Sequence, residues 1–119
     1  MRQPFSFCVA LLLLILGSGC QESPIRSKEA VLREELKTMR DQISNYTTDK
    51  EKRPQSLQDL VDAGYMRRIP TDPFTGSTTT WQVEISESLR PLDQKKPGVR
   101  DVHSGSNLIG SNGTAYSSW

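Results

Sequence analysis

The histidine of this chain, His103, stands between Asp101 and Ser104, and these three residue types are the ones that a serine hydrolase uses. In such a triad the serine attacks, the imidazole takes its proton and the carboxylate orients the imidazole. Here all three lie within four positions of one expected strand, so Asp101 and His103 share a face while Ser104 points to the other. We therefore expect a polar strand end and no enzymatic activity. The chain also lacks a glycine-rich phosphate loop, a pair of cysteines for zinc and a nucleophile elbow.

A second residue able to carry chemistry is Cys20, which follows a positive start at Arg2, an apolar block over residues 5–16 and small residues at 17–19. This order is typical of a secretory signal peptide, and the cysteine makes it resemble a lipoprotein signal. We expect removal of residues 1–19 and acylation of the Cys20 thiol. The apolar block is too short to span ~30 Å of hydrocarbon, which takes about 20 helical residues. The alternative is an ordinary signal peptide with an incidental cysteine.

The composition of the remaining chain, residues 20–119, is that of one small domain with balanced charge. Loss of the leader takes Arg2 from the 15 basic residues and leaves them equal in number to the 14 acidic ones. A neutral chain gives no electrostatic reason to bind nucleic acid. Cys8 leaves with the leader and Cys20 is acylated, so the domain must be held together by packing without a disulfide.

The N-terminal part of this domain shows a helical pattern. Residues 20–28 are polar and contain a proline, so we expect a short lipidated tether there. Apolar residues then recur at spacings of four and three, which predicts an α-helix over residues 29–46 with one apolar stripe. The stripe consists of Leu32, Leu36, Met39, Ile43 and Tyr46. Charged residues such as Glu29 and Arg40 are expected to face water. Residues 47–53 lack apolar side chains, which predicts a loop.

A second, shorter helix is predicted over residues 56–63. Ser56 can cap its start, Asp59 stands three residues later as in a capping box, and Gly64 suits the left-handed conformation that ends a helix. Two prolines and a glycine in residues 69–76 then exclude regular structure and favour consecutive turns.

Two strands complete the expected domain. Residues 78–85 are β-branched and aromatic with Trp81, Val83 and Ile85 in alternation, which predicts a half-buried strand. A charged, proline-containing loop follows, and residues 99–103 predict a second short strand. One long helix, one short helix and a small antiparallel sheet with long C-terminal loops make an α+β domain.

In this order, the elements resemble the C-terminal domain of the G-type, or major, pseudopilin of type II secretion systems. The resemblance covers residues 29–119, and its most specific part is the proline-rich loop after the second helix. Besides the apolar stripe, the matching residues are Arg53, Pro54, Ser56, Leu57, Gln58, Asp59, Leu60, Gly64, Tyr65, Met66, Ile69, Pro70, Asp72, Pro73, Phe74, Gly76, Asp101, Val102, His103, Ser104 and Gly105. The resemblance implies a pilin-like head, with the long N-terminal helix packed on the sheet.

Within the proline-rich loop, Pro70, Asp72, Pro73, Phe74 and Gly76 are expected to have a structural role. Pro73 fixes its own backbone angle and pushes Asp72 out of the helical region, while Phe74 can act as an apolar plug. We expect a turn from the second helix into the sheet, with no chemistry of its own.

The chain departs from the pseudopilin pattern at its N-terminus. A pseudopilin continues after its leader as a membrane helix of about twenty apolar residues. Here the residues after Gly19 are polar and interrupted by Pro24, so no membrane helix can form there. The chain therefore resembles a pseudopilin head on a lipid anchor, which favours an anchored accessory over a filament subunit.

The resemblance also implies a possible calcium site. G-type pseudopilins bind calcium in their C-terminal loop through aspartates and backbone carbonyls. In this chain the weak candidate ligands are Asp101, Ser104, Asn107 and Asn112, with no second carboxylate after Asp101. Calcium favours about six to eight oxygens, several of them charged. We therefore expect no metal or other cofactor, with calcium at these four residues as the alternative.

These patterns predict a non-enzymatic, lipid-anchored, pseudopilin-like protein associated with type II secretion. Its expected partners are pseudopilins or other secretion-system components, contacted through the exposed sheet edge and loops, and the membrane through acylated Cys20. We expect it in the cell envelope facing the periplasm, with the outer membrane preferred because Gln21 is not the acidic residue that often retains lipoproteins at the inner membrane. The alternative is an envelope lipoprotein binding module unrelated to secretion that has retained the pilin-like head. The oligomeric state is left open.

Overall fold

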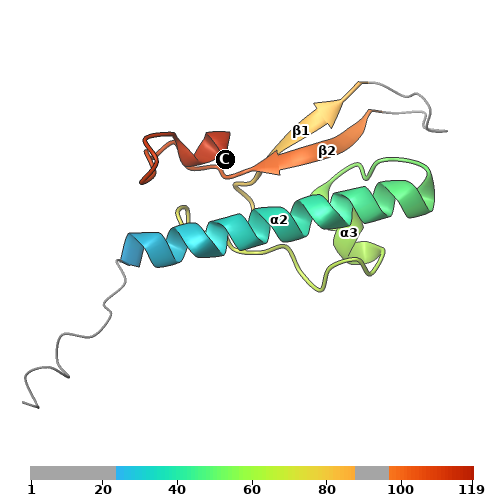
Figure 1. Ribbon diagram of the computed structural model, residues 1–119. Helices are drawn as coiled ribbons and strands as arrows, with labels where there is room; N and C mark the ends of the chain where they lie inside the picture. Colours follow the sequence, from blue (N-terminus) through green and yellow to red (C-terminus); the bar gives the residue numbers. More distant parts are fainter. Residues whose placement is uncertain (1–23, 88–96) are drawn as a thin grey trace, which may run out of the picture.

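A computed structural model describes residues 24–87 and 97–119, whose arrangement is shown in Figure 1. The long helix α2 (Pro24–Lys50) runs along the domain, with the short helix α3 (Leu57–Asp62) on one side of it. The strands β1 (Gln82–Ser86) and β2 (Gly98–His103) lie on the other side, and a 3-10 turn, η1 (Tyr116–Ser118), follows them. The α+β class expected from the sequence is confirmed. The predicted leader and Cys20 lie outside the described residues.

Helix α2 is longer at both ends than the sequence pattern indicated. It begins at Pro24, so residues 24–28 of the predicted tether are helical. Proline suits this position because the first N–H groups of a helix have no partner within it. The helix continues to Lys50, so the prediction of a loop over residues 47–53 is wrong for residues 47–50. Polar side chains do not stop a helix on its solvent side, and it ends where Glu51 takes a φ of 55°.

The buried stripe of α2 starts three residues earlier than predicted, at Glu29. The apolar residues Leu32, Leu36, Met39, Ile43 and Tyr46 are buried as expected. Glu29 continues the same spacing and is only 2% exposed, so the prediction that it faces water is wrong. Arg40, also assigned to water, is half-buried. Position around the helix axis decides which side chains face the domain, whatever their type.

Helix α3 confirms both of its predicted end signals. The Ser56 side chain accepts a hydrogen bond from the Asp59 N–H at the start of the helix. At the other end Gly64 takes a φ of 83°, and the N–H groups that follow the helix donate to carbonyls of its last turn in a Schellman motif. Leu57 and Leu60 are thereby turned into the core, where both are buried.

The antiparallel pairing of β1 and β2 contains a bulge. Glu84 pairs with Asp101, but the next residue of β1 pairs with Val99, so Arg100 is the extra residue in β2. Val99 and Val102 are three positions apart and are both 0% exposed. A regular strand would turn them to opposite faces, so the bulge is what lets both valines enter the core.

Strand β1 is shorter than predicted and presents its apolar residues to solvent. The strand expected over residues 78–85 begins only at Gln82. Trp81 is buried as predicted, but Val83 and Ile85 are 41% and 46% exposed, so their expected burial is wrong. The reason is that β2 packs on α2 while β1 lies beyond it (Figure 1). A strand face is buried only where another layer covers it.

One cluster of apolar side chains joins both helices, β2 and the C-terminal turn. Its buried members are Leu32, Leu36, Met39, Ile43, Tyr46, Leu57, Leu60, Trp81, Val99, Val102 and Tyr116. Within residues 24–87 and 97–119, no helix has the length and apolar character needed to cross a membrane.

Candidate functional site

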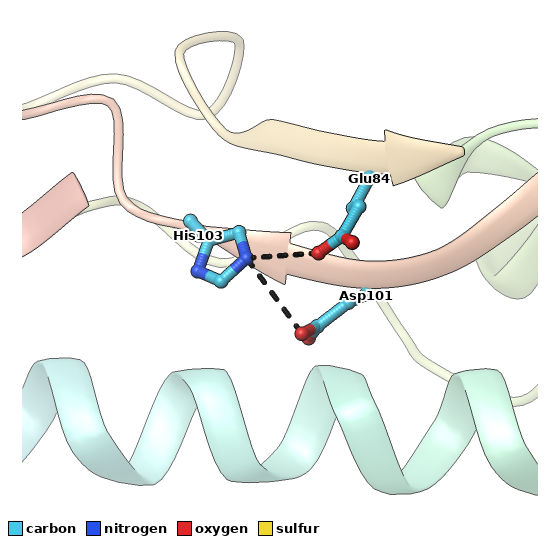
Figure 2. Close-up of side chains that lie close together, drawn as sticks. All are labelled: Glu84, Asp101 and His103. Atoms are coloured by element: carbon cyan, nitrogen blue, oxygen red, sulfur yellow. Dashed lines mark hydrogen bonds and ion pairs between the residues drawn. The ribbon is translucent and has the colours of Figure 1, made fainter. Parts of the chain in front are cut away.

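Three side chains able to bind a proton or a metal ion meet on the sheet: Glu84 from β1 and Asp101 and His103 from β2 (Figure 2). The register brings them together, because Glu84 lies directly opposite Asp101 and His103 is two residues further along the same strand. One ligand atom from each residue lies within 4.8 Å of the others, and all three residues are half-buried. The sequence indicated Asp101 and His103 as neighbours on one face, but not Glu84.

The imidazole of His103 is held in one orientation. Its Nδ1 lies 2.7 Å from the main-chain oxygen of Trp119, and since that oxygen can only accept, Nδ1 carries the hydrogen and donates. A longer contact of 3.4 Å joins Nδ1 to the Arg40 guanidinium. The other nitrogen, Nε2, lies 3.4 Å from Oε2 of Glu84 and 3.6 Å from Oδ2 of Asp101. In the neutral ring, Nε2 therefore presents its lone pair toward two carboxylate oxygens.

Each carboxylate of this cluster uses its other oxygen to bind an arginine. Arg40 of α2 donates from Nε to Oδ1 of Asp101 at 2.7 Å, and its NH2 group donates to the main-chain oxygens of Val102 and Trp119. Arg100, the bulge residue, forms an ion pair with Oε1 of Glu84. The arginines balance the two negative charges and leave Oε2 and Oδ2 directed at Nε2.

Ser104 takes no part in this cluster. Its side chain is fully buried, and its Oγ donates to Oδ2 of Asp72 at 2.6 Å. The serine of the apparent triad thus points away from His103, as the strand geometry predicted. The three residues Asp101, His103 and Ser104 do not converge.

Asp72 of the predicted structural loop connects that loop to the end of β2. It is 0% exposed, and its carboxylate accepts hydrogen bonds from the Phe74 N–H, the Ser104 hydroxyl and the Gly105 N–H. Its main chain also bonds to Gly76 and to Ser77. These contacts support a structural role for Asp72.

The other residues of the loop also contact the core. The Pro70 carbonyl accepts a hydrogen bond from Nε1 of Trp81 at 2.8 Å. The Phe74 ring stacks on the ring of Tyr116 with centroids 3.8 Å apart, which is the plug expected from the sequence. Pro73 and Gly76 shape the turn, Gly76 with a φ of 70°.

The four weak calcium candidates do not form a calcium cage. Ser104 donates to Asp72, and Oδ1 of Asn112 accepts from both the N–H and the hydroxyl of Thr114. Asp101 lies against Arg40, and Asn107 is exposed. Calcium needs several oxygens directed at one point, whereas the oxygens of Ser104, Asn112 and Asp101 are directed at separate partners in the protein.

Glu29 is a buried group that the sequence argument missed. Its carboxylate accepts the N–H and the hydroxyl of Ser111 at 2.8 and 2.5 Å, and the hydroxyl of Tyr116 at 2.9 Å. The Ser111 hydrogen bonds hold the pKa of Glu29 below its ordinary value, against the opposing effect of burial. The signal available in the sequence was its place on the helix stripe. Glu29 thereby joins the first turns of α2 to the C-terminal segment.

Glu35 is a second glutamate of α2 whose environment the sequence did not reveal. Its Oε2 is buried with no hydrogen-bond partner among the described residues. Burial raises the pKa of Glu35 to about 7, and the negative charge of Asp72 adds to the rise. No pattern in the sequence places Glu35 next to Asp72.

Comparison of the chain with protein-family models, with curated proteins and with solved structures gives no match.

Proposed function

We propose that this protein is a non-enzymatic, lipid-anchored, pseudopilin-like component associated with type II secretion, and that it works by protein-protein contacts. The proposal rests on the sequence resemblance, which is carried mainly by the loop around Asp72. Its proposed partners are pseudopilins or other secretion-system components. Its proposed location is the cell envelope, facing the periplasm, with the outer membrane preferred and acylated Cys20 as the anchor.

The observation that carries the contact proposal is the outward-facing strand β1. Val83 and Ile85 are 41% and 46% exposed, although both belong to the residue types that usually fill a core. Among the described residues β1 is paired only with β2, so its other edge has main-chain groups open to a partner strand. Proteins use such edges for strand addition, in which the main chain supplies affinity and alternate side chains supply specificity.

The layout of α2 supports the pilin-like part of the proposal. A helix of 27 residues with one buried stripe packs on β2 and on α3. The helix starts at Pro24, only a few residues after Cys20. An acylated Cys20 would therefore hold the head close to the membrane surface.

Binding to the major pseudopilin of the same cell tests the contact proposal. The full chain in detergent is titrated with that pseudopilin, and the variant Val83→Lys is compared with Val31→Lys, which changes a comparably exposed valine on α2. We expect Val83→Lys to weaken binding at least about tenfold and Val31→Lys to leave it unchanged. No binding at high concentration would contradict the secretion role and favour a binding module unrelated to secretion.

The anchor is tested separately, by the mass of the protein taken from native membranes. Loss of residues 1–19 together with the added mass of acyl chains on Cys20 is expected. An uncleaved chain would contradict the anchor without bearing on the contacts of β1.

A further inference from the structure

We propose that Glu84, Asp101 and His103 form a binding site for a divalent cation of the zinc class, with Oε2, Oδ2 and Nε2 as the three protein ligands. The site shares only Asp101 with the calcium candidates, and it differs from a calcium loop in Glu84 and His103, in its place on the sheet and in its nitrogen ligand. It is independent of the proposed role in secretion, because it is argued from the cluster alone.

Nε2 of His103 and Oε2 of Glu84 are within hydrogen-bond distance, and the distances between the ligand atoms also suit a bound metal ion. Nε2 lies 3.4 Å from Oε2 of Glu84 and 3.6 Å from Oδ2 of Asp101. A charged N–H donating to a carboxylate lies at about 2.7–2.9 Å, so both separations are long for that bond. Two ligands at about 2.1 Å from a tetrahedral zinc ion are about 3.4 Å apart. The two separations from Nε2 therefore match a tetrahedron edge, and all three ligand atoms lie within 4.8 Å of one another.

Each ligand atom is oriented by a second contact of its own group. Nδ1 of His103 donates to the main-chain oxygen of Trp119, Oδ1 of Asp101 accepts from Arg40, and Oε1 of Glu84 pairs with Arg100. Bound zinc is characteristically surrounded by such outer contacts, which fix the histidine tautomer and the ligand directions. Here they leave one atom of each group directed at the others.

The ligand set and the charges indicate the class of metal. An imidazole nitrogen suits zinc and its neighbours in the first transition row, while calcium and magnesium favour oxygen alone. Two carboxylates would neutralise the charge of a divalent ion. Arg40 and Arg100 oppose it, but their side chains are 36% and 55% exposed, so solvent screens that repulsion. A fourth position on the ion stays open to water.

Zinc titration of the full chain tests the proposal, with the protein purified without a histidine tag and its thiols blocked by alkylation. Zinc is expected to bind with a 1:1 stoichiometry and to raise the melting temperature, with no comparable effect of calcium or magnesium. Glu84→Gln and His103→Gln should each weaken zinc binding at least about tenfold. Glu87→Gln, which removes an exposed carboxylate next to β1, should leave it unchanged.

Nuclear magnetic resonance on the one histidine of the chain gives a readout that does not depend on the variants folding. Zinc should shift the Nε2 signal of His103 and leave Nδ1 protonated. The proposal is overturned if zinc does not bind, if zinc binds without changing Nε2, or if either folded ligand variant retains the parent affinity.

Discussion

Two glutamates on the buried side of α2 are in opposite electrostatic states. Glu29, near the start of the helix, is 2% exposed and accepts three hydrogen bonds from Ser111 and Tyr116. Glu35, further along, has a buried oxygen without a partner and lies near the negative charge of Asp72. The pKa of Glu29 is lowered, while that of Glu35 is raised to about 7.

The difference shows that the available donors, and not burial by itself, decide the charge state of a buried carboxylate. The C-terminal segment presents hydroxyl and N–H donors to Glu29. Glu35 Oε2 has no donor among the described residues, and the nearby Asp72 carboxylate instead accepts the donors of Phe74, Ser104 and Gly105. The environment of Glu29 therefore stabilises its charged form, whereas the environment of Glu35 stabilises its neutral form.

The largest expected effect on the free energy of unfolding comes from removing Asp72, which accepts the three hydrogen bonds of Phe74, Ser104 and Gly105. Asp72→Ala leaves the Phe74 and Gly105 N–H groups and the Ser104 hydroxyl without their acceptor in a buried place. We expect the free energy of unfolding to fall by about 3 kcal/mol, measured by urea denaturation. Asp41→Ala, on the exposed face of α2, is the control. A loss no larger than that of the control would show that the Asp72 hydrogen bonds do not hold the loop to β2.

A smaller effect is expected from Glu29→Gln, which removes the charge that Ser111 and Tyr116 stabilise. The folded-state pKa of Glu29 lies below its unfolded value, so its charge stabilises the fold above about pH 4.5 and loses that effect as the pH falls through the folded pKa. The variant should melt at a lower temperature than the parent at pH 7, and the gap should close in acid. Glu34→Gln, which changes an exposed glutamate, is the control. An equal difference in melting temperature at pH 7 and in acid would contradict the stabilisation of charged Glu29.

The smallest expected effect, of opposite sign, comes from Glu35→Gln. Because the folded-state pKa of Glu35 is raised from 4.5 to about 7, the parent protein should lose stability as the pH rises through that range. The carboxyl group is partly in contact with solvent, so we expect a gain of roughly 1 kcal/mol from the variant at pH 8 and none at pH 4.5. Urea denaturation at both pH values measures it. A variant that is less stable than the parent at pH 8 would contradict the raised pKa.

Local signals in the sequence predicted much of the fold. The stripe from Leu32 to Tyr46 is buried, Ser56 and Gly64 mark the ends of α3, and Phe74 enters the core. The ends of α2 and the burial of β1 were predicted wrongly. A polar segment can still be helical, and an apolar strand is exposed when no second layer covers it.

The candidate site was predictable only in part. Asp101 and His103 follow from alternation on one strand, and the separation of Ser104 from them follows from the same rule. Glu84 could not be assigned, because its position opposite Asp101 depends on the register of β1 and β2. The hydrogen bond from Arg40 to the Trp119 main-chain oxygen joins parts of the chain more than sixty residues apart.

What the sequence by itself determined are properties that depend on near neighbours: the helix stripe, the ends of α3 and the turn around Asp72. The tertiary structure decided which groups surround each carboxylate. It placed Glu29 on the donors of Ser111, Glu35 beside Asp72, and Glu84 opposite Asp101. The physical reason is that hydrogen bonding and charge act over a few ångströms of space, and local sequence patterns do not report which distant residues occupy that space.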